Sequence, residues 1–148
     1  MFRKILVCLD GSKLAEQIMP YAAEQAAHFD SSLVLFQVVS LASLPTPTGI
    51  ESVPVAVPDV QLAEAEAAAK EYLEGLAVPL REKGIKVQCV AKIGHPAESI
   101  VSYAEEGKFD LVAIATHGRS GLKRLVFGSV ADYVVRKSGR PILLIKPK

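Results

Sequence analysis

A glycine motif in the last third of the sequence is the strongest sign of chemistry. Ala115-Thr116-His117-Gly118 is followed, after a gap of nine residues, by Gly128-Ser129. The apolar run Leu111–Ala115 predicts a strand that leads into the first block, and a helix is expected to begin at the second. Such a loop can wrap an anion in backbone N–H groups. Ser129 can be the N-cap of that helix, offer its hydroxyl to the anion, or do both.

The charges between the two glycine blocks have one sign. Arg119, Lys123 and Arg124 lie there, and no acidic residue does. This composition favours an anionic ligand such as a phosphate. His117 could contact the phosphate or pack against the loop. No carboxylate in the sequence pattern orients its imidazole, so we assign it no catalytic role.

Strand and helix signals alternate strictly along the chain, which predicts a parallel sheet covered by helices on both faces. The half-exposed run Ile85–Lys92 is expected at an edge of the sheet. Pro20 is expected to kink the first helix or distort its first turn. The Pro-rich stretch from Leu41 to Asp59 is expected to be a flexible loop without regular structure. The predicted strands are Lys4–Leu9, Ser32–Val39, Ile85–Lys92, Leu111–Ala115 and Pro141–Ile145, and the predicted helices span 12 to about 29, Gln61–Lys83, 96 to about 106 and 129 to about 138.

The fold class is therefore a single α/β domain over residues 1–148, a three-layer α/β/α sandwich with a five-stranded parallel sheet. In the strand order 3-2-1-4-5, strands one and four are neighbours where the order reverses. Ligands bind beyond the carboxyl ends of the strands at such a point. Asp10, after strand one, would then line one cleft with the loop from Thr116 to Ser129. Asp10 could instead stabilise the turn into the first helix.

Composition excludes several classes of protein. The chain has 148 residues, 50% hydrophobic, with a net charge of +1 and no tryptophan, which argues against a nucleic-acid-binding surface. No apolar stretch is long enough for a membrane span, and the short run after Phe2 is not a signal peptide, so a cytoplasmic protein is predicted. Cys8 and Cys89 fit no metal pattern and are expected to be buried thiols. The Walker A and G-x-G-x-x-G motifs are absent.

From end to end the sequence resembles the universal stress protein family. The resemblance rests on Lys4-Ile5-Leu6-Val7 through Asp10-Gly11-Ser12, on Gly94-His95-Pro96, on the segment from Asp110 to Gly118, on Gly128-Ser129-Val130 and on the segment from Pro141 to Lys146. The nucleotide-binding branch of that family carries G-x2-G-x9-G-[ST]. Gly118, the nine-residue gap, Gly128 and Ser129 match this motif, whereas Ala115 replaces its first glycine.

The resemblance implies an ATP site, or one for ADP or AMP, with Mg²⁺. Cys8 and Val38 would present backbone groups to adenine, and Asp10 would face the ribose or a phosphate-bridging Mg²⁺. The ribose and phosphates would lie against the two glycine blocks. The family is typically a homodimer paired through its last strand, here residues 142–145. The residues implied in nucleotide binding are Cys8, Asp10, Val38, Ala115, Thr116, His117, Gly118, Arg119, Gly128, Ser129 and Val130.

Three functions are compatible with this resemblance. The first is a homodimeric nucleotide sensor of the stress response that signals to a protein partner not identified by the sequence. The second is a slow ATPase or self-phosphorylating enzyme, although the sequence shows no general base near the phosphates. The third is a nucleotide-free dimeric interaction module, which Ala115 would favour if its methyl group closes the site.

Overall fold

Five parallel strands form one sheet in the order β3-β2-β1-β4-β5. In this computed structural model the described residues are 1–44, 57–116 and 128–148. β1 is central and pairs with β2 from Lys4↔Ser32 to Leu9↔Gln37, and with β4 from Ile5↔Leu111 to Val7↔Ala113. The predicted strand order is confirmed. The strands are β1 (Lys4–Leu9), β2 (Ser32–Val39), β3 (Val87–Ile93), β4 (Leu111–Ala115) and β5 (Ile142–Ile145).

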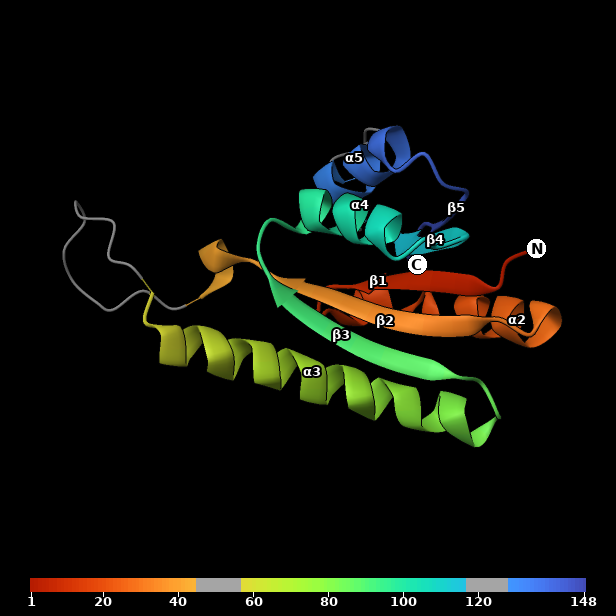
Figure 1. Ribbon diagram of the computed structural model, residues 1–148, viewed down its shortest axis with the longest axis horizontal. Coiled ribbons are helices and arrows are strands. Elements are labelled where there is room, and N and C mark those ends of the chain that lie inside the picture. The colour runs from red at the N-terminus through yellow and green to blue at the C-terminus, as the bar shows by residue number, and fades with distance from the viewer. Residues whose placement is uncertain (45–56, 117–127) are drawn as a thin grey trace.

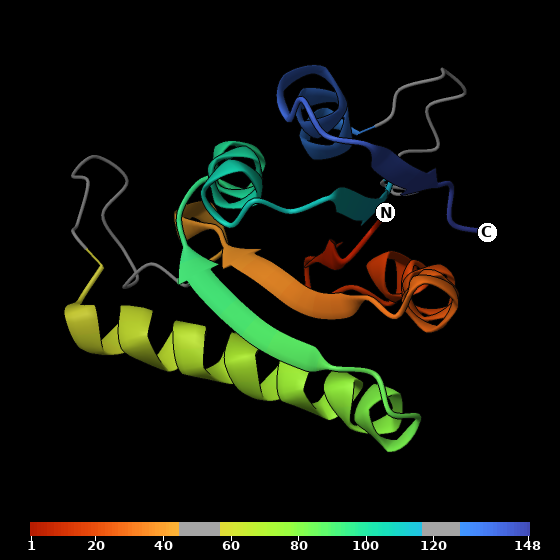
Figure 2. The same ribbon diagram turned by 45° about the vertical axis from the view of Figure 1, so that its right-hand side comes forward.

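Helices cover both faces of this sheet, as Figures 1 and 2 show. One face packs against α1, α2 and α3, and the other against α4 and α5. The predicted three-layer α/β/α architecture is thus confirmed. The helices are α1 (Lys13–Glu16), α2 (Met19–Phe29), α3 (Asp59–Glu82), α4 (Pro96–Glu106) and α5 (Ser129–Lys137), and η1 (Leu41–Ser43) is a single 3-10 turn.

The apolar strands explain why both faces are covered. Ile5, Leu6 and Val7 are consecutive and fully buried, so neither face of β1 can meet water. Asp110 secures the start of the sheet, because its Oδ2 accepts hydrogen bonds from the backbone N–H groups of Arg3 (3.0 Å) and Lys4 (2.9 Å). Cys8 and Cys89 are buried free thiols, as predicted.

The first predicted helix is two helices. Gln17 N–H donates to Leu14 O (3.2 Å) and Ile18 N–H to Ala15 O (3.2 Å), which is a tightened end for α1. Pro20 then lies in the first turn of α2, where its missing N–H costs nothing. Because proline cannot donate to the carbonyl four residues earlier, a continuous helix is broken here, in line with the expected distortion.

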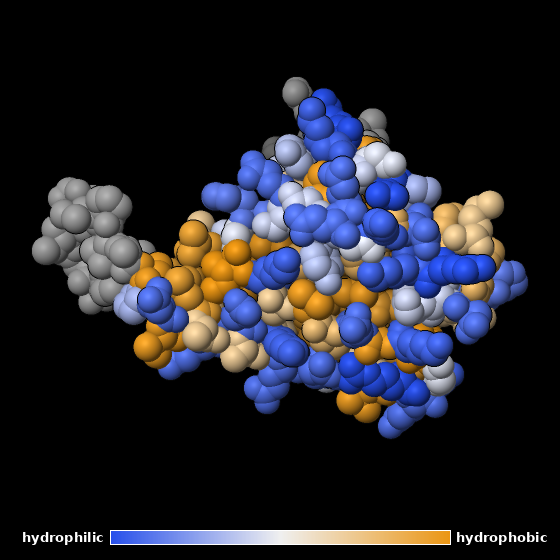
Figure 3. Space-filling view, in the orientation of Figure 1, coloured by the Kyte–Doolittle hydropathy of each residue, from blue (hydrophilic) through white to orange (hydrophobic). Residues whose placement is uncertain are grey.

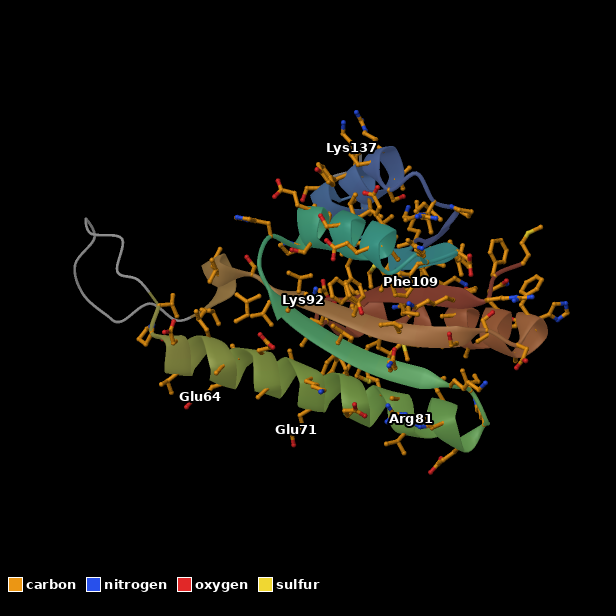
Figure 4. The ribbon with its side chains drawn as sticks, viewed as in Figure 1. Glu64, Glu71, Arg81, Lys92, Phe109 and Lys137 are labelled. Atoms are coloured by element: carbon orange, nitrogen blue, oxygen red, sulfur yellow. The ribbon has the colours of Figure 1, made fainter. Side chains whose placement is uncertain are left out.

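The segment between β2 and α3 differs slightly from expectation. Its first residues form η1, and α3 begins at Asp59, two residues earlier than predicted. Residues 45–56 of the predicted loop lie outside the described residues. Two apolar residues that flank residues 45–56 are exposed, Leu41 with an exposed fraction of 46% and Val60 with one of 69%. Figure 3 shows an orange, hydrophobic area in this part of the surface. By contrast, Glu64 and Glu71 project from the outer face of α3 in Figure 4.

Candidate functional site

A pocket opens at the carboxyl ends of β1 and β4, where the strand order reverses. Its empty volume, including the open mouth, is about 610 Å³. β1, β2 and β4 supply its floor, α1 one wall, and the first turns of α4 and α5 the other. The lining residues are Cys8, Leu9, Asp10, Ala15, Val38, Pro96, Ile100, Ile114, Ala115, Thr116, Val130 and Ala131.

The inner part of the pocket is apolar. Cys8, Val38, Ile100, Ile114 and Ala131 all belong to the core cluster between the sheet and the helices α4 and α5. Cys8 is only 5% exposed, and this burial raises the pKa of its thiol, so the sulfur is neutral at physiological pH. A surface of this kind favours a flat apolar or aromatic group, because burying a charge against it is costly.

The mouth of the pocket carries its polar groups. Asp10 Oδ1 accepts hydrogen bonds from Ser12 N–H (2.9 Å) and Ser12 Oγ (2.6 Å), so the carboxylate stabilises the turn after β1. Gly11 lies in that turn at φ +85°, a conformation that favours glycine. Ser12 Oγ also accepts from Ala15 N–H (3.1 Å) and thereby caps α1. Asp10 therefore has the turn-stabilising role and also lines the pocket.

The start of α5 corrects one prediction. Gly128, at φ +40°, is the N-cap residue, and no side chain caps this helix. Ser129 is instead the first helical residue, so the predicted Ser129 N-cap is wrong. The cause is local: the chain enters the helix with positive φ, which glycine adopts readily and serine does not. The Ser129 hydroxyl lies at the exposed N-terminal end of α5.

Six of the predicted site residues lie together in this pocket: Cys8, Asp10, Val38, Ala115, Thr116 and Val130. Gly128 and Ser129 precede the lining residue Val130 but do not line the pocket themselves. His117, Gly118 and Arg119 lie outside the described residues, as do Lys123 and Arg124.

The sequence analysis missed the residues of α1 and α4 that complete the walls. These are Ala15, Pro96 and Ile100, and all three are apolar. Ala15 and Ile100 belong to no motif, and Pro96 belongs to the Gly94-His95-Pro96 segment but was not assigned to the site. The signal for Pro96 and Ile100 was available. Connections between parallel strands are right-handed, which decides which face of the sheet is covered by the helix that follows an edge strand. The first turn of that helix then lies at the carboxyl ends of the strands.

Metal-binding groups are sparse in the described structure. No cluster of three or more His, Cys, Asp or Glu side chains suited to a cation occurs within residues 1–44, 57–116 and 128–148. Asp10 is the single carboxylate among the described residues that line the pocket. One carboxylate suffices for Mg²⁺ only when phosphate oxygens supply further ligands. Across the same ranges, no helix has the length and apolar character needed to cross a bilayer.

Comparison with known proteins gives a consistent result. The profile of the universal stress protein family matches residues 1–146. Universal stress protein YxiE of Bacillus subtilis is 30% identical over 99% of this chain and 100% of its own. Universal stress protein MJ0531 of Methanocaldococcus jannaschii is 30% identical over 99% of this chain and 83% of its own.

Solved structures share the fold. That of MJ0577 from the same archaeon superposes with a TM-score of 0.81 at 27% identity, over 100% of this chain and 98% of that one. A universal stress protein in complex with cAMP gives a TM-score of 0.65 at 18% identity, covering 99% and 98% of the two chains. An Arabidopsis thaliana family protein with AMP bound gives 0.61 at 17% identity, covering 99% and 92%.

Proposed function

We propose the following function for this chain, which belongs to the universal stress protein family. It is a homodimeric, cytoplasmic stress-response protein that binds ATP, ADP or AMP in the pocket at the ends of β1 and β4. The observation that carries this proposal is the polarity of that pocket. Its inner part is apolar and its mouth holds Asp10 and the start of α5. A nucleotide has the same polarity, from an uncharged base to charged phosphates.

The pocket suggests one orientation for the nucleotide. The base would lie over Cys8 and Val38, against Ile100 and Ile114, where no charged side chain of the described lining intrudes. Asp10 would accept a hydrogen bond from a ribose hydroxyl or hold Mg²⁺ together with the phosphates. The phosphates would lie toward Ala115 and the N-terminus of α5, where backbone N–H groups are unpaired within the helix. Two structural relatives that carry cAMP and AMP support an adenine nucleotide.

The replacement of the first motif glycine by Ala115 is tolerable in this arrangement. Ala115 is the last residue of β4 and pairs with Ile145 of β5, so its backbone is that of a regular strand, in which alanine is unstrained. Ala115 also lines the pocket. The only added group is one methyl, which narrows the site slightly.

The proposed dimer uses β5. This strand ends the sheet, and Ile142, Leu143, Leu144 and Ile145 are all only partly buried within one chain. A short apolar edge strand of this kind has backbone groups and side chains to offer a second copy. The role of the dimer would be to report pocket occupancy to a protein partner.

Isothermal titration of ATP with Mg²⁺ into protein stripped of ligand tests the proposal. We expect micromolar binding that is lost in Gly118→Val and weakened in Ser129→Ala, with Ser102→Ala, at an exposed position on α4, as the matched control. Omission of Mg²⁺ should weaken ATP more than AMP, because AMP has fewer phosphate oxygens for the metal. No heat with ATP, ADP, AMP or cyclic AMP would contradict nucleotide binding. Recovery of binding in Ala115→Gly would then assign the loss to that methyl group, and the chain would act as a dimeric interaction module.

A further inference from the structure

The last two residues of α1 and its C-cap residue Gln17 contact three different parts of the molecule. Ala15 lines the pocket. The carboxylate of Glu16 accepts a hydrogen bond from the hydroxyl of Tyr72 on α3. The side chain of Gln17 contacts the backbone of Lys148, which follows β5. α1 therefore lies where the pocket, the longest helix and the end of the sheet meet.

The contact of Gln17 with Lys148 is a two-point clamp. Lys148 N–H donates to Gln17 Oε1 (2.9 Å), and Gln17 Nε2 donates to the carbonyl of Lys148 (3.2 Å). A side-chain amide that both donates to and accepts from one residue fixes that residue in position and in orientation. Because both partners on Lys148 are backbone atoms, the clamp depends on where the chain runs after β5 and not on the lysine side chain.

A continuous series of bonds leads from the clamp to the pocket. From Gln17 the backbone of α1 leads to Ala15, whose N–H donates to Ser12 Oγ (3.1 Å), and Ser12 Oγ donates to Asp10 Oδ1 (2.6 Å). α1 has only four residues, too few to be stable as an isolated helix. Its position, and with it that of the Asp10 turn, is therefore set by its contacts with the rest of the molecule.

We propose that Gln17 is a positioning residue for the pocket: through α1 it couples the docking of residues 146–148 to the placement of Asp10 and Ala15. A ligand in the pocket and a docked C-terminal segment then stabilise each other, and the coupling acts equally in both directions. This inference rests on the proposed nucleotide site. It adds that the chain leaving the edge strand β5 is linked to ligand occupancy.

Gln17→Met tests the coupling, because methionine has a similar length and keeps neither hydrogen bond. We expect its affinity for ATP to fall about fivefold or more relative to the unchanged chain. Gln17→Glu keeps the acceptor for Lys148 N–H and loses the donor, so we expect a smaller loss. Gln25→Met, at a half-buried glutamine of α2 that does not line the pocket, is the matched control and should bind ATP normally.

The reciprocal measurement separates positioning from a general loss of stability. In the unchanged chain, ATP should slow hydrogen exchange of the Lys148 amide by the factor that Gln17→Met loses in affinity. In Gln17→Met this ATP-dependent protection should vanish. Unaltered ATP affinity in Gln17→Met, or Lys148 exchange that ignores ATP, would overturn the coupling while leaving the nucleotide site in place. Failure of the unchanged chain to bind any nucleotide would instead remove the proposed function and this inference together.

Should Gln17→Met not fold, as thermal unfolding would show, Gln17→Glu and the Lys148 exchange of the unchanged chain decide the matter. Normal ATP affinity in Gln17→Glu together with ATP-independent exchange of Lys148 would also count against the coupling.

Discussion

The two edges of the sheet are completed in opposite ways. At β3, the guanidinium of Arg81 donates to the carbonyl of Val87 from Nε (3.2 Å) and Nη2 (2.8 Å), and Glu74 holds Arg81 at 2.6 Å. This carbonyl faces away from β2, because that of Lys86, one residue earlier, accepts from Leu33 N–H. An arginine of α3 thus occupies a backbone group on the outer edge of β3, and Figure 4 labels its place on that helix.

At β5, no side chain of the described residues is found to bond an outward-facing backbone group in this way. The four strand residues are apolar and half-buried. The carbonyl of Pro141 accepts from Val112 N–H of β4, and that of Ile145 accepts from the N–H of Thr116, which directly follows β4. Because backbone groups alternate along a strand, those of Ile142 and Leu144 face outward. The comparison indicates that one edge is closed by side chains of its own chain, and that the other is suited to pairing with a second copy.

The largest effect is expected from Leu144→Pro, which removes an outward N–H from β5 and leaves the bonds to β4 intact. In a two-fold dimer the substitution acts twice, so we expect the dissociation constant to rise about a hundredfold. Leu144→Val keeps the N–H and is the control that should remain dimeric. Sedimentation equilibrium measures both. A Leu144→Pro chain that is folded and as dimeric as the unchanged one would place the interface elsewhere.

Removing Arg81 from the edge at β3 should have a smaller effect on association. Arg81→Met removes the donors to Val87 O and leaves that carbonyl free to pair, so we expect concentration-dependent association beyond the proposed dimer. Light scattering on warming would detect it. Arg136→Met is the control, since within the described part of the chain Arg136 pairs with the Asp132 side chain of its own helix (3.1 Å) and with no backbone group of an edge strand. Equal behaviour of the two variants would show that Arg81 does not protect the edge.

Acid should weaken the contact between α1 and α3, because that contact includes the carboxylate of Glu16. The hydrogen bond from Tyr72, with the charge of Lys13 adding to it, holds the pKa of Glu16 below its ordinary value. A lowered folded pKa contributes stability that is present above the unfolded pKa and is lost as pH falls through the folded one. We therefore expect the unfolding free energy to decline below about pH 4, less steeply in Tyr72→Phe. Urea titrations at several pH values measure this free energy. If it falls equally steeply with pH in Tyr72→Phe and in the unchanged chain, the hydrogen bond does not have this role.

The smallest effect is expected from Glu74→Gln. Glu74 and Arg81 are exposed, and their hydrogen bond lowers the pKa of Glu74, so the pair stays charged throughout the neutral range. Exposed pairs contribute little because water and salt screen them. We expect thermal stability close to that of the unchanged chain, with Arg81 still able to reach Val87. Association as strong as that of Arg81→Met would show that Arg81 protects the edge at β3 only when it is paired with Glu74.

Periodicity and apolar runs predicted the sheet well. The bounds of β1, β2 and β4 match the prediction, because each strand is largely apolar and is followed by polar or turn residues, although Gln37 interrupts the apolar run of β2. The half-exposed strand was also placed correctly at an edge, since Gln88 and Lys92 are exposed. Strand ends set by tertiary contacts were predicted less well. β3 begins at Val87 and not at Ile85, and β5 begins after Pro141.

The candidate site was predicted only where a motif marks it. Asp10 and Val130 belong to recognisable segments, whereas Ala15 and Ile100 are ordinary apolar helix residues whose relevance depends on how helices pack. The Ser129 error has a similar origin, because a backbone angle at Gly128 decides which residue caps α5 and no residue pattern specifies it. The clamp of Gln17 on Lys148 joins residues 131 positions apart, and nothing local in the sequence indicates it.

The pairing of β1 with β4 has a consequence for how the molecule assembles. β1, β2 and β3 with their helices are complete by Ile93, whereas β4 must return to β1, so that Asp110 meets the backbone of Arg3, 107 positions away. Contacts of such separation form late and slowly, since a long loop must close first. The pocket straddles this seam, with Cys8 and Val38 on one side and Ala115 and Val130 on the other. A ligand that touches both sides would slow the parting of the two portions and so lengthen the lifetime of the folded chain.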